Sequence, residues 1–209
     1  MKYTCFALDF DNCLAYHKDG RERLLKMFTA LGFDYSTVKR AYRDAVDDAN
    51  LSVNAIASAI ERETGRQIDQ SGLQDKFDEW ISSAPTLFPD VSAFLGTLES
   101  LKIPTAIVTY GRPDLQQKKV DLADIKYDKI FITDEVGKKF TVLKNLLDTY
   151  GAPIAFVDDR PDELDNAREQ FGENEVRTFR IIRGTGRHDD EPQKFDHPIV
   201  HSVLEIPIE

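Results

Sequence analysis

The chain has 209 residues, of which 41% are hydrophobic, with 13 Phe and 7 Tyr. This composition excludes an intrinsically disordered chain, and the length excludes a miniprotein held together by disulfides. Charged residues make up 31% of the chain and the formal net charge is -10, so we expect no nucleic-acid polymer as a partner, because phosphate groups are repelled by an acidic surface.

The N-terminal part predicts one strand followed by a block of helices. Residues 3–10 form a buried, β-prone run that ends in carboxylates. Between residues 14 and 87 no strand signal stands out and the apolar residues recur at helical spacing. Four stripes carry this pattern: Leu24, Leu25, Phe28 and Leu31; Val38, Tyr42, Ala45 and Val46; Val53, Ile56, Ala57 and Ile60; and Leu73, Phe77, Trp80 and Ile81. We expect a small helical bundle.

From residue 91 onward, helices alternate with strands. Amphipathic helices are predicted near 91–101, 115–125, 142–150 and 164–171, and short buried strands at 105–109, 129–133, 154–157 and 176–182. This alternation favours right-handed crossovers and a parallel sheet that is covered on both faces. The strand in residues 3–10 is expected to join the same sheet.

The fold class is therefore α/β, with a Rossmann-like, three-layer parallel-sheet core and an inserted α-helical cap domain. We expect the core to comprise residues 1–14 and 88–209 and the cap to comprise residues 15–87. Residues 183–198 are rich in Gly, Pro and charge and are predicted to form a long loop. Residues 199–206 are expected to pack back onto the body.

Two further features concern the compartment. Cys5 and Cys13 are the only cysteines, and both lie in or near one apolar run, so we expect reduced core thiols. No stretch approaches the roughly 18 apolar residues of a membrane helix, and the N-terminus lacks a secretory apolar region. We therefore expect a cytoplasmic protein without a membrane partner, as a monomer or a homodimer.

Acidic pairs follow two of the predicted strands. Asp9 and Asp11 end the first strand, and Asp158 and Asp159 directly follow the apolar run IAFV. In open α/β sheets, ligands bind beyond the carboxyl ends of the strands. Carboxylate oxygens are the ligands preferred by hard divalent cations such as Mg²⁺. Each pair alone is also compatible with a solvated strand end or a helix cap.

A hydroxyl and a lysine pair lie at two further strand ends. Thr109 ends the run TAIVT and is followed by Tyr110 and Gly111. A hydroxyl with free backbone N–H groups at such a turn can bind phosphoryl oxygens. Lys138 and Lys139 precede the helix of residues 142–150, where a lysine could neutralise a phosphoryl group. Taken separately, these residues are better explained as a turn threonine and two surface lysines.

The four features together resemble the haloacid dehalogenase superfamily. An acid pair, a hydroxyl, a lysine and a second acid pair follow one another in this order, each beside a predicted parallel strand. The four motifs of that superfamily come in the same order at such strand ends, and its helical cap is inserted between the first two. The resemblance covers nearly the whole chain, and it is specific for the family rather than for a substrate.

The resemblance implies roles for the site residues. Asp9 resembles the nucleophile, Asp11 the general acid/base and Thr109 the phosphate-binding hydroxyl. Lys139 or Lys138 resembles the lysine of the third motif, and we favour Lys139 because of its spacing to the following helix. Tyr110 and Gly111 would complete the phosphate-binding turn, although the family commonly has Asn at position 110. The loss of that amide near the nucleophile could lower the rate or alter the substrate pose.

The resemblance also implies Mg²⁺ as the cofactor. Asp158 and Asp159 resemble its carboxylate ligands, joined by Asp9 and the backbone carbonyl of Asp11. The implied activity is hydrolysis of a small phosphate monoester through an aspartyl-phosphate intermediate. Asp11 favours this chemistry over dehalogenation, because a leaving halide needs no proton and dehalogenases of the family lack this second aspartate.

Several alternatives stay open at this stage. A phosphomutase or a nucleotidase of the same fold would use the same residues, and a catalytically silent binding protein would keep the fold. A phosphonate hydrolase would need a cap lysine, for which Lys18 is conceivable. A signalling receiver domain is disfavoured, because it needs no helical insert after its first strand. Tyr16, His17 and Lys18 lie on the first connection into the cap and could reach the leaving group or form a solvated hinge.

Overall fold

The computed structural model describes residues 2–18, 20–47, 51–83, 85–184 and 188–208. In this part of the chain a six-stranded parallel sheet has the order β5-β4-β1-β6-β7-β8. The strands are β1 (Cys5–Leu8), β4 (Thr105–Tyr110), β5 (Lys129–Thr133), β6 (Ile154–Asp158), β7 (Val176–Ile181) and β8 (Ile199–Val200). β1 lies at the centre, between β4 and β6, and all four of its residues are buried. A strand covered on both faces has to be apolar throughout, which explains the run CFAL.

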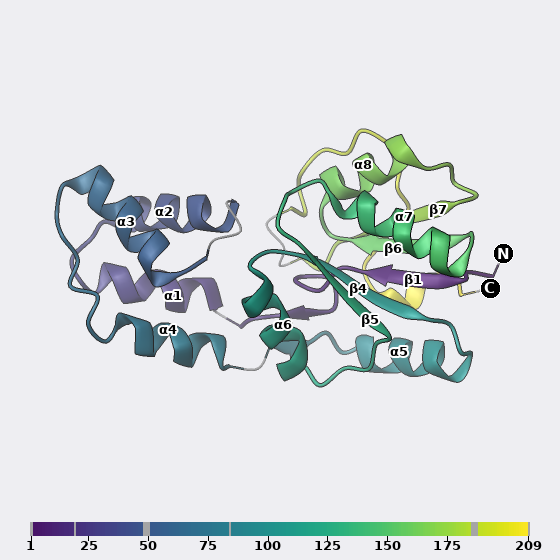
Figure 1. Cartoon of the computed structure of the whole chain (residues 1–209), viewed down its shortest axis with the longest axis horizontal. Coiled ribbons are helices and arrows are strands. Elements are labelled where there is room, and N and C mark those ends of the chain that lie inside the picture. The colour runs from purple at the N-terminus through teal and green to yellow at the C-terminus, as the bar shows by residue number, and fades with distance from the viewer. Residues whose placement is uncertain (1, 19, 48–50, 84, 185–187, 209) are drawn as a thin grey trace.

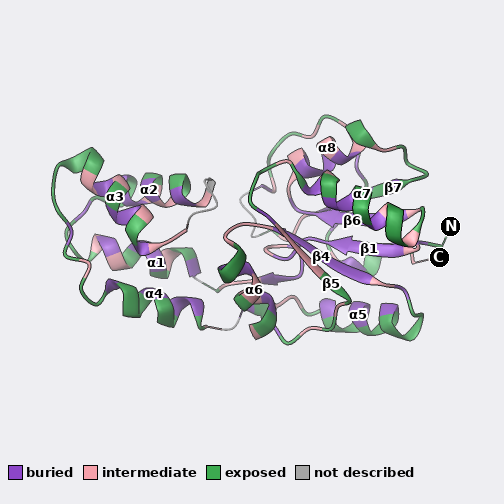
Figure 2. Cartoon of the chain, viewed as in Figure 1, coloured by how far each residue is buried: buried purple, intermediate pink, exposed green. Residues whose placement is uncertain are grey.

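Helices cover both faces of this sheet and complete the three layers (Figure 1). They are α5 (Val91–Ser100), α6 (Pro113–Leu122), α7 (Lys139–Tyr150) and α8 (Pro161–Gln170). α5 and α6 pack in one apolar cluster with the short 3₁₀ helix η1 (Val203–Glu205), and α7 and α8 pack in another. Figure 2 shows that buried residues line the sheet-facing sides of these helices. The predicted fold class is thus confirmed.

In the described residues between β1 and α5, four helices form the cap and have an apolar core of their own. They are α1 (Gly20–Thr29), α2 (Tyr35–Asp47), α3 (Val53–Thr64) and α4 (Leu73–Ile81). All four expected stripes lie on these helices, with Leu31 just beyond the end of α1 and exposed. The indole N–H of Trp80 donates to the carbonyl of Gly20 over 2.8 Å, which ties the end of the bundle to its beginning.

The expectation that residues 14–87 contain no strand was wrong. β2 (Ala15–Tyr16) pairs antiparallel with β3 (Thr86–Leu87) where the chain enters and leaves the cap. Strands of two residues are too short to show a period of two in the sequence, so the pattern could not reveal them. The short ribbon holds the two connections side by side at the base of the cap.

Other element boundaries differ by a few residues. β1 is shorter than the run of residues 3–10, and α6 begins at Pro113 rather than at residue 115, in line with the preference for Pro in the first helical turn. In residues 199–206, β8 joins the edge of the sheet and η1 packs under α5, so this segment does pack back onto the body. None of the described helices has the length and apolarity needed to cross a membrane.

Arg183 joins three parts of the fold below the site. Its guanidinium donates to the carbonyl of Cys13 at 2.8 and 3.1 Å and pairs with the carboxylate of Asp90 at 2.9 Å. The guanidinium also lies 4.2 Å from the ring centre of Phe88. Both side chains of the ion pair are largely buried, with exposed fractions of 5% for Arg183 and 12% for Asp90. The contact therefore fixes the loop after β1 against the connection that returns from the cap.

We expect Arg183→Met to lower the free energy of unfolding by about 3 kcal/mol, because it leaves the carboxylate of Asp90 buried without its cation. Urea denaturation followed by circular dichroism measures this loss. Lys126→Met removes an exposed pair with Glu99 and serves as the control, for which no comparable loss is expected. Equal effects of the two substitutions would show that the buried pair does not anchor this loop.

Candidate active site

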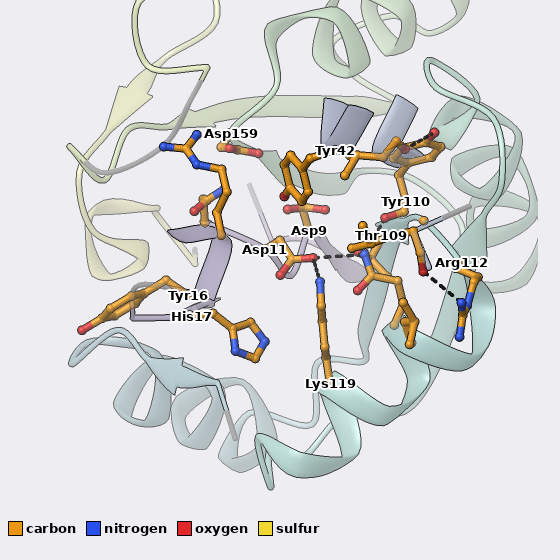
Figure 3. Close-up of a pocket in the computed structure, with 18 of the residues that line it drawn as sticks. Asp9, Asp11, Tyr16, His17, Tyr42, Thr109, Tyr110, Arg112, Lys119 and Asp159 are labelled. Carbon is orange, nitrogen blue, oxygen red and sulfur yellow. Dashed lines mark hydrogen bonds and ion pairs between the residues drawn. The ribbon is translucent and has the colours of Figure 1, made fainter. Parts of the chain in front are cut away.

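The carboxyl ends of the central strands open into a cavity between the sheet and the cap. The cavity has a volume of about 610 Å³ and is lined by residues of both parts. Figure 3 shows Asp9, Asp11, Thr109 and Asp159 converging at its base. β1, β4 and β6 are neighbours in the sheet and run parallel, so residues about 100 positions apart in sequence end at the same edge.

A buried lysine links the ends of β1 and β6. Nζ of Lys139 lies 2.5 Å from Oδ1 of Asp9 and 2.7 Å from Oδ2 of Asp158. The Lys139 side chain is 1% exposed and that of Asp158 is fully buried. The other oxygen of Asp158 accepts a hydrogen bond of 2.9 Å from the N–H of Arg160. The ammonium group of Lys139 is therefore the positive charge in direct contact with both buried carboxylates.

A third carboxylate completes an acidic cluster. Oxygens of Asp9, Asp158 and Asp159 lie within 4.8 Å of one another. Oδ2 of Asp159 is buried and has no hydrogen-bond partner among the described residues. A buried oxygen without a partner is costly, and one lysine does not balance three carboxylates. The donor set, which consists of hard oxygens, fits a cation such as Mg²⁺.

Burial and mutual repulsion shift the protonation equilibria of this cluster. Burial and the neighbouring Asp158 raise the pKa of Asp9 to about 7, although Lys139 opposes this shift. Burial, followed by the charges of Asp9 and Asp158, raises the pKa of Asp159 well above its ordinary value. Burial disfavours the charged form of Lys139, but the two carboxylates beside it raise its pKa. The cluster therefore holds more negative charge than its single lysine can stabilise.

The structure separates the two candidate lysines. Lys139 begins α7 and points into the acidic cluster, whereas Lys138 is exposed and lies 3.8 Å from Glu135. The turn before them is held by Glu163, which accepts hydrogen bonds from the N–H groups of Gly137 at 2.7 Å and Lys139 at 3.2 Å. Glu163 is fully buried and was not anticipated. Its place in the first turn of α8, shortly after Asp158 and Asp159, is the only local signal for it.

The end of β4 brings Thr109 to the cavity, whereas Tyr110 and Gly111 make hydrogen bonds to other parts of the chain. Thr109 is buried and lines the cavity. The hydroxyl of Tyr110 donates to the carbonyl of Val46 in α2 over 3.1 Å, so this side chain connects the core to the cap. The N–H of Gly111 donates to the carbonyl of Thr133 at 2.9 Å, so it is already used in this arrangement. The expected turn is present, but the N–H of Gly111 is not free to bind a phosphoryl oxygen in this arrangement.

Asp11 is held by two side chains of α6. Its Oδ2 accepts hydrogen bonds from Nζ of Lys119 at 2.7 Å and from Nε2 of Gln116 at 3.0 Å (Figure 3). Burial opposes the charged form of Asp11, yet Lys119 and Gln116 hold its pKa below the ordinary value. These contacts could not be predicted from the sequence, because more than 100 residues separate the partners. Asp11 is therefore ionised and oriented at the entrance to the acidic cluster.

We expect Lys139→Met to lower the free energy of unfolding by about 3–5 kcal/mol without added divalent cations, since it leaves Asp9 and Asp158 buried without the cation that lies between them. The matched control is Lys138→Met, for which a change of less than about 0.5 kcal/mol is expected at this exposed position. Urea denaturation of the two variants measures both values. A larger loss in the Lys138 variant would contradict the assignment of Lys139 to the buried pair.

Comparisons with solved structures find proteins of similar fold. A putative haloacid dehalogenase-like hydrolase from Burkholderia xenovorans LB400 has 16% identity and a TM-score of 0.71, with 96% of this chain and 95% of that chain covered. The L-2-haloacid dehalogenase PA0810 has 18% identity and a TM-score of 0.65, with 98% and 97% covered. The magnesium-bound putative HAD-hydrolase YfnB from Bacillus subtilis has 13% identity and a TM-score of 0.65, with 98% and 97% covered.

No protein-family model matches the sequence, and no curated protein matches it significantly. The structural likeness extends over nearly the full length of both chains in each comparison, so it includes the cap as well as the sheet. The described part of the chain has the strand order β5-β4-β1-β6-β7-β8, with the helical insertion after the first strand. The chain therefore has the fold of the haloacid dehalogenase-like hydrolases, with a helical cap above the carboxyl edge of its sheet.

Proposed function

We propose that this chain is a Mg²⁺-dependent phosphomonoester hydrolase that works through an aspartyl-phosphate intermediate. The observation that carries the proposal is the buried cluster of Asp9, Asp158 and Asp159 around a single lysine at the edge of the sheet. Such a cluster attracts a cation and, with it, an anionic phosphoryl group. The cavity above it accommodates a small phosphate ester.

The carboxylates of Asp9, Asp158 and Asp159 would hold the Mg²⁺ ion, with the backbone carbonyl of Asp11 as a further oxygen ligand. When bound, the ion supplies positive charge that offsets the repulsion between a phosphate and the aspartates. The unpartnered oxygen of Asp159 supports this assignment, since a metal would satisfy it. A small-molecule ester in the cytoplasm would be the natural partner of such a site.

In the proposed first step, a carboxylate oxygen of Asp9 attacks the phosphorus atom and the bond to the leaving alkoxide breaks. Lys139 holds Asp9 in place through its hydrogen bond of 2.5 Å and contributes positive charge beside the phosphoryl oxygens. The hydroxyl of Thr109 would donate to one of those oxygens. The product of this step is an aspartyl-phosphate, which divides one difficult hydrolysis into two easier reactions.

Asp11 would handle the protons of both steps. It gives a proton to the leaving alkoxide and later takes one from the water that attacks the aspartyl-phosphate, which is worth about 10²–10⁴ in rate. In the structure Lys119 and Gln116 hold Asp11 in its ionised form. This state suits the second step, and proton donation in the first step requires that Asp11 take up a proton as the contact with Lys119 loosens.

Dehalogenation is the second candidate, because proteins of similar structure include L-2-haloacid dehalogenases. Both reactions would begin with attack by Asp9. A departing halide needs no proton, so Asp11 would have no task in dehalogenation. The excess of buried carboxylates also disfavours a haloacid, whose carboxylate they would repel without a cation. Persistence of the aspartyl-phosphate with return of the phosphoryl group to a sugar would instead indicate a phosphomutase.

We expect Asp9→Asn to reduce Mg²⁺-dependent hydrolysis of p-nitrophenyl phosphate by at least about 10³-fold, since the amide is a poor nucleophile. Release of p-nitrophenolate measures the rate. Asp75→Asn, at an exposed position of α4, is the matched control and should retain the activity of the unmodified chain.

Full activity of the Asp9→Asn variant, or activity that is indifferent to a chelator, would overturn this mechanism. Halide release from L-2-chloropropionate in the absence of phosphatase activity would favour dehalogenation instead. Both assays use the intact chain, so the two candidate functions are distinguished on one preparation.

Metal binding has a readout that does not depend on turnover. At a Mg²⁺ concentration of 100 times the dissociation constant, binding stabilises the folded state by about 2.7 kcal/mol, which raises the melting temperature by roughly 5–10 °C in a chain of this size. We expect this shift by scanning calorimetry, and no such shift with K⁺ at equal ionic strength.

Asp159→Asn should have opposite effects with and without the ion. It removes one of three crowded carboxylates, so the metal-free variant should melt at or above the temperature of the unmodified chain. It also removes a proposed ligand, so its shift with Mg²⁺ should be smaller. An undiminished shift would mean that the cation binds without Asp159.

A further inference from the structure

The cavity has a charge opposite to that of the chain. The whole chain has a formal net charge of -10, yet the described lining of the cavity includes eight Lys or Arg and only four Asp or Glu residues. The basic residues are Lys18, Arg21, Lys39, Arg43, Arg112, Lys119, Lys139 and Arg160. One phosphoryl group and one Mg²⁺ ion at the acidic cluster do not account for this excess of positive charge.

The basic residues of the core are already paired. Lys139 lies between Asp9 and Asp158, Lys119 contacts Asp11, Arg112 contacts Asp114, and Arg160 contacts Asp162, all at 2.5–2.7 Å. These contacts neutralise the charge on the side of the cavity formed by the sheet. The positive charge left over must therefore lie on the side of the cap.

Two cations of helix α2 have no such partner among the residues that the structure describes. Among the described residues, no carboxylate lies within 4.0 Å of the side-chain nitrogens of Lys39 or Arg43, and both residues line the cavity. They are four positions apart, so they share one face of the helix, where like charges repel each other. Such a pair is unfavourable in the empty cavity and becomes favourable when an anion binds to both.

Contacts between cap and core fix this face of α2 above the site. The hydroxyl of Tyr110 donates to the carbonyl of Val46 near the end of α2, and Nη1 of Arg112 donates to the carbonyl of Leu51 at 2.9 Å. Tyr42 of the same helix lines the cavity together with Asp9, and Figure 3 labels both side chains. Lys39, which is half-buried, and Arg43, which is exposed, therefore line the same cavity as the proposed nucleophile.

Building on the proposed phosphatase activity, we infer that the preferred substrate carries a second anionic group, which Lys39 and Arg43 bind on the cap side of the cavity. A volume of about 610 Å³ leaves room for several carbon atoms between the two ends. Guanidinium and ammonium groups bind carboxylate and phosphate alike. The shared chemistry is thus an oxyanion at the far end of a small phosphate ester.

Matched substrates test the inference. 6-Phosphogluconate and sorbitol 6-phosphate differ only in a terminal carboxylate, and fructose 1,6-bisphosphate and fructose 6-phosphate differ in one phosphate. With Mg²⁺ present, we expect kcat/KM to be about 10–100-fold higher, in at least one pair, for the substrate that carries a second anionic group. The pair with the larger ratio identifies the second group as carboxylate or phosphate. Ratios near one for both pairs would overturn the inference.

Two cap variants test the assignment of the residues. Arg43→Met and Lys39→Met should each reduce the kcat/KM ratio within the preferred pair by about 10-fold or more. Arg62→Met, at an exposed position of α3 outside the cavity, is the control and should leave the ratio unchanged. A ratio that survives in both cap variants would contradict the role of α2.

Binding separates this inference from the phosphatase proposal. If p-nitrophenyl phosphate is not hydrolysed by the unmodified chain, the phosphatase proposal fails. Calorimetric titration of the Asp9→Asn variant with each substrate pair still measures recognition without turnover. Tighter binding of a doubly anionic member, lost when Arg43→Met is added, supports the anion site, whereas equal binding within both pairs overturns it.

Discussion

The shared contact of Lys139 with Asp9 and Asp158 is the constraint on which the site depends. Three strongly buried carboxylates at one sheet edge would repel one another, and the lysine offsets only part of that repulsion. The remaining excess of negative charge arises only in the folded chain, because Lys139 is 130 residues from Asp9 and 19 residues from Asp158 in the sequence. A cation is the simplest group that completes this balance, and the proposed chemistry follows from that need.

Two side chains outside the acidic cluster, Glu163 and Arg183, hold its surroundings in position. Glu163 holds the turn that begins α7 through two backbone N–H groups, so the position of Lys139 is set from the first turn of α8. Arg183 does the same for the loop after β1 by binding the carbonyl of Cys13. Both side chains act on backbone atoms, which keeps the reacting groups in place without occupying the cavity.

The parts of the fold and the site that could be predicted are those with a local pattern in the sequence. Asp9, Thr109 and Asp158 each end a buried strand, and strand ends can be read from local apolar runs, so their common location was predictable. The apolar residues at helical spacing on α1 to α4 predicted the cap in the same way. Glu163, Lys119 and Gln116 were missed, because each acts on a partner that only the tertiary fold brings near, and a single polar residue on a helix has no periodicity.

Tyr110 connects the strand end at Thr109 to the cap. From the sequence it was a departure from the Asn common in the resembled family, with a possible cost at the nucleophile. In the structure its hydroxyl bonds the carbonyl of Val46, so a residue directly after Thr109 anchors α2 over the site. Because solvent-exposed charges more than roughly 8–10 Å apart are screened at physiological salt, the charges that line the cavity act on a bound anion more strongly than those of the acidic exterior. On the proposed function, the lining of the cap would govern which anion is retained there, and Tyr110 makes the position of that lining depend on the same strand end that would bind the phosphate.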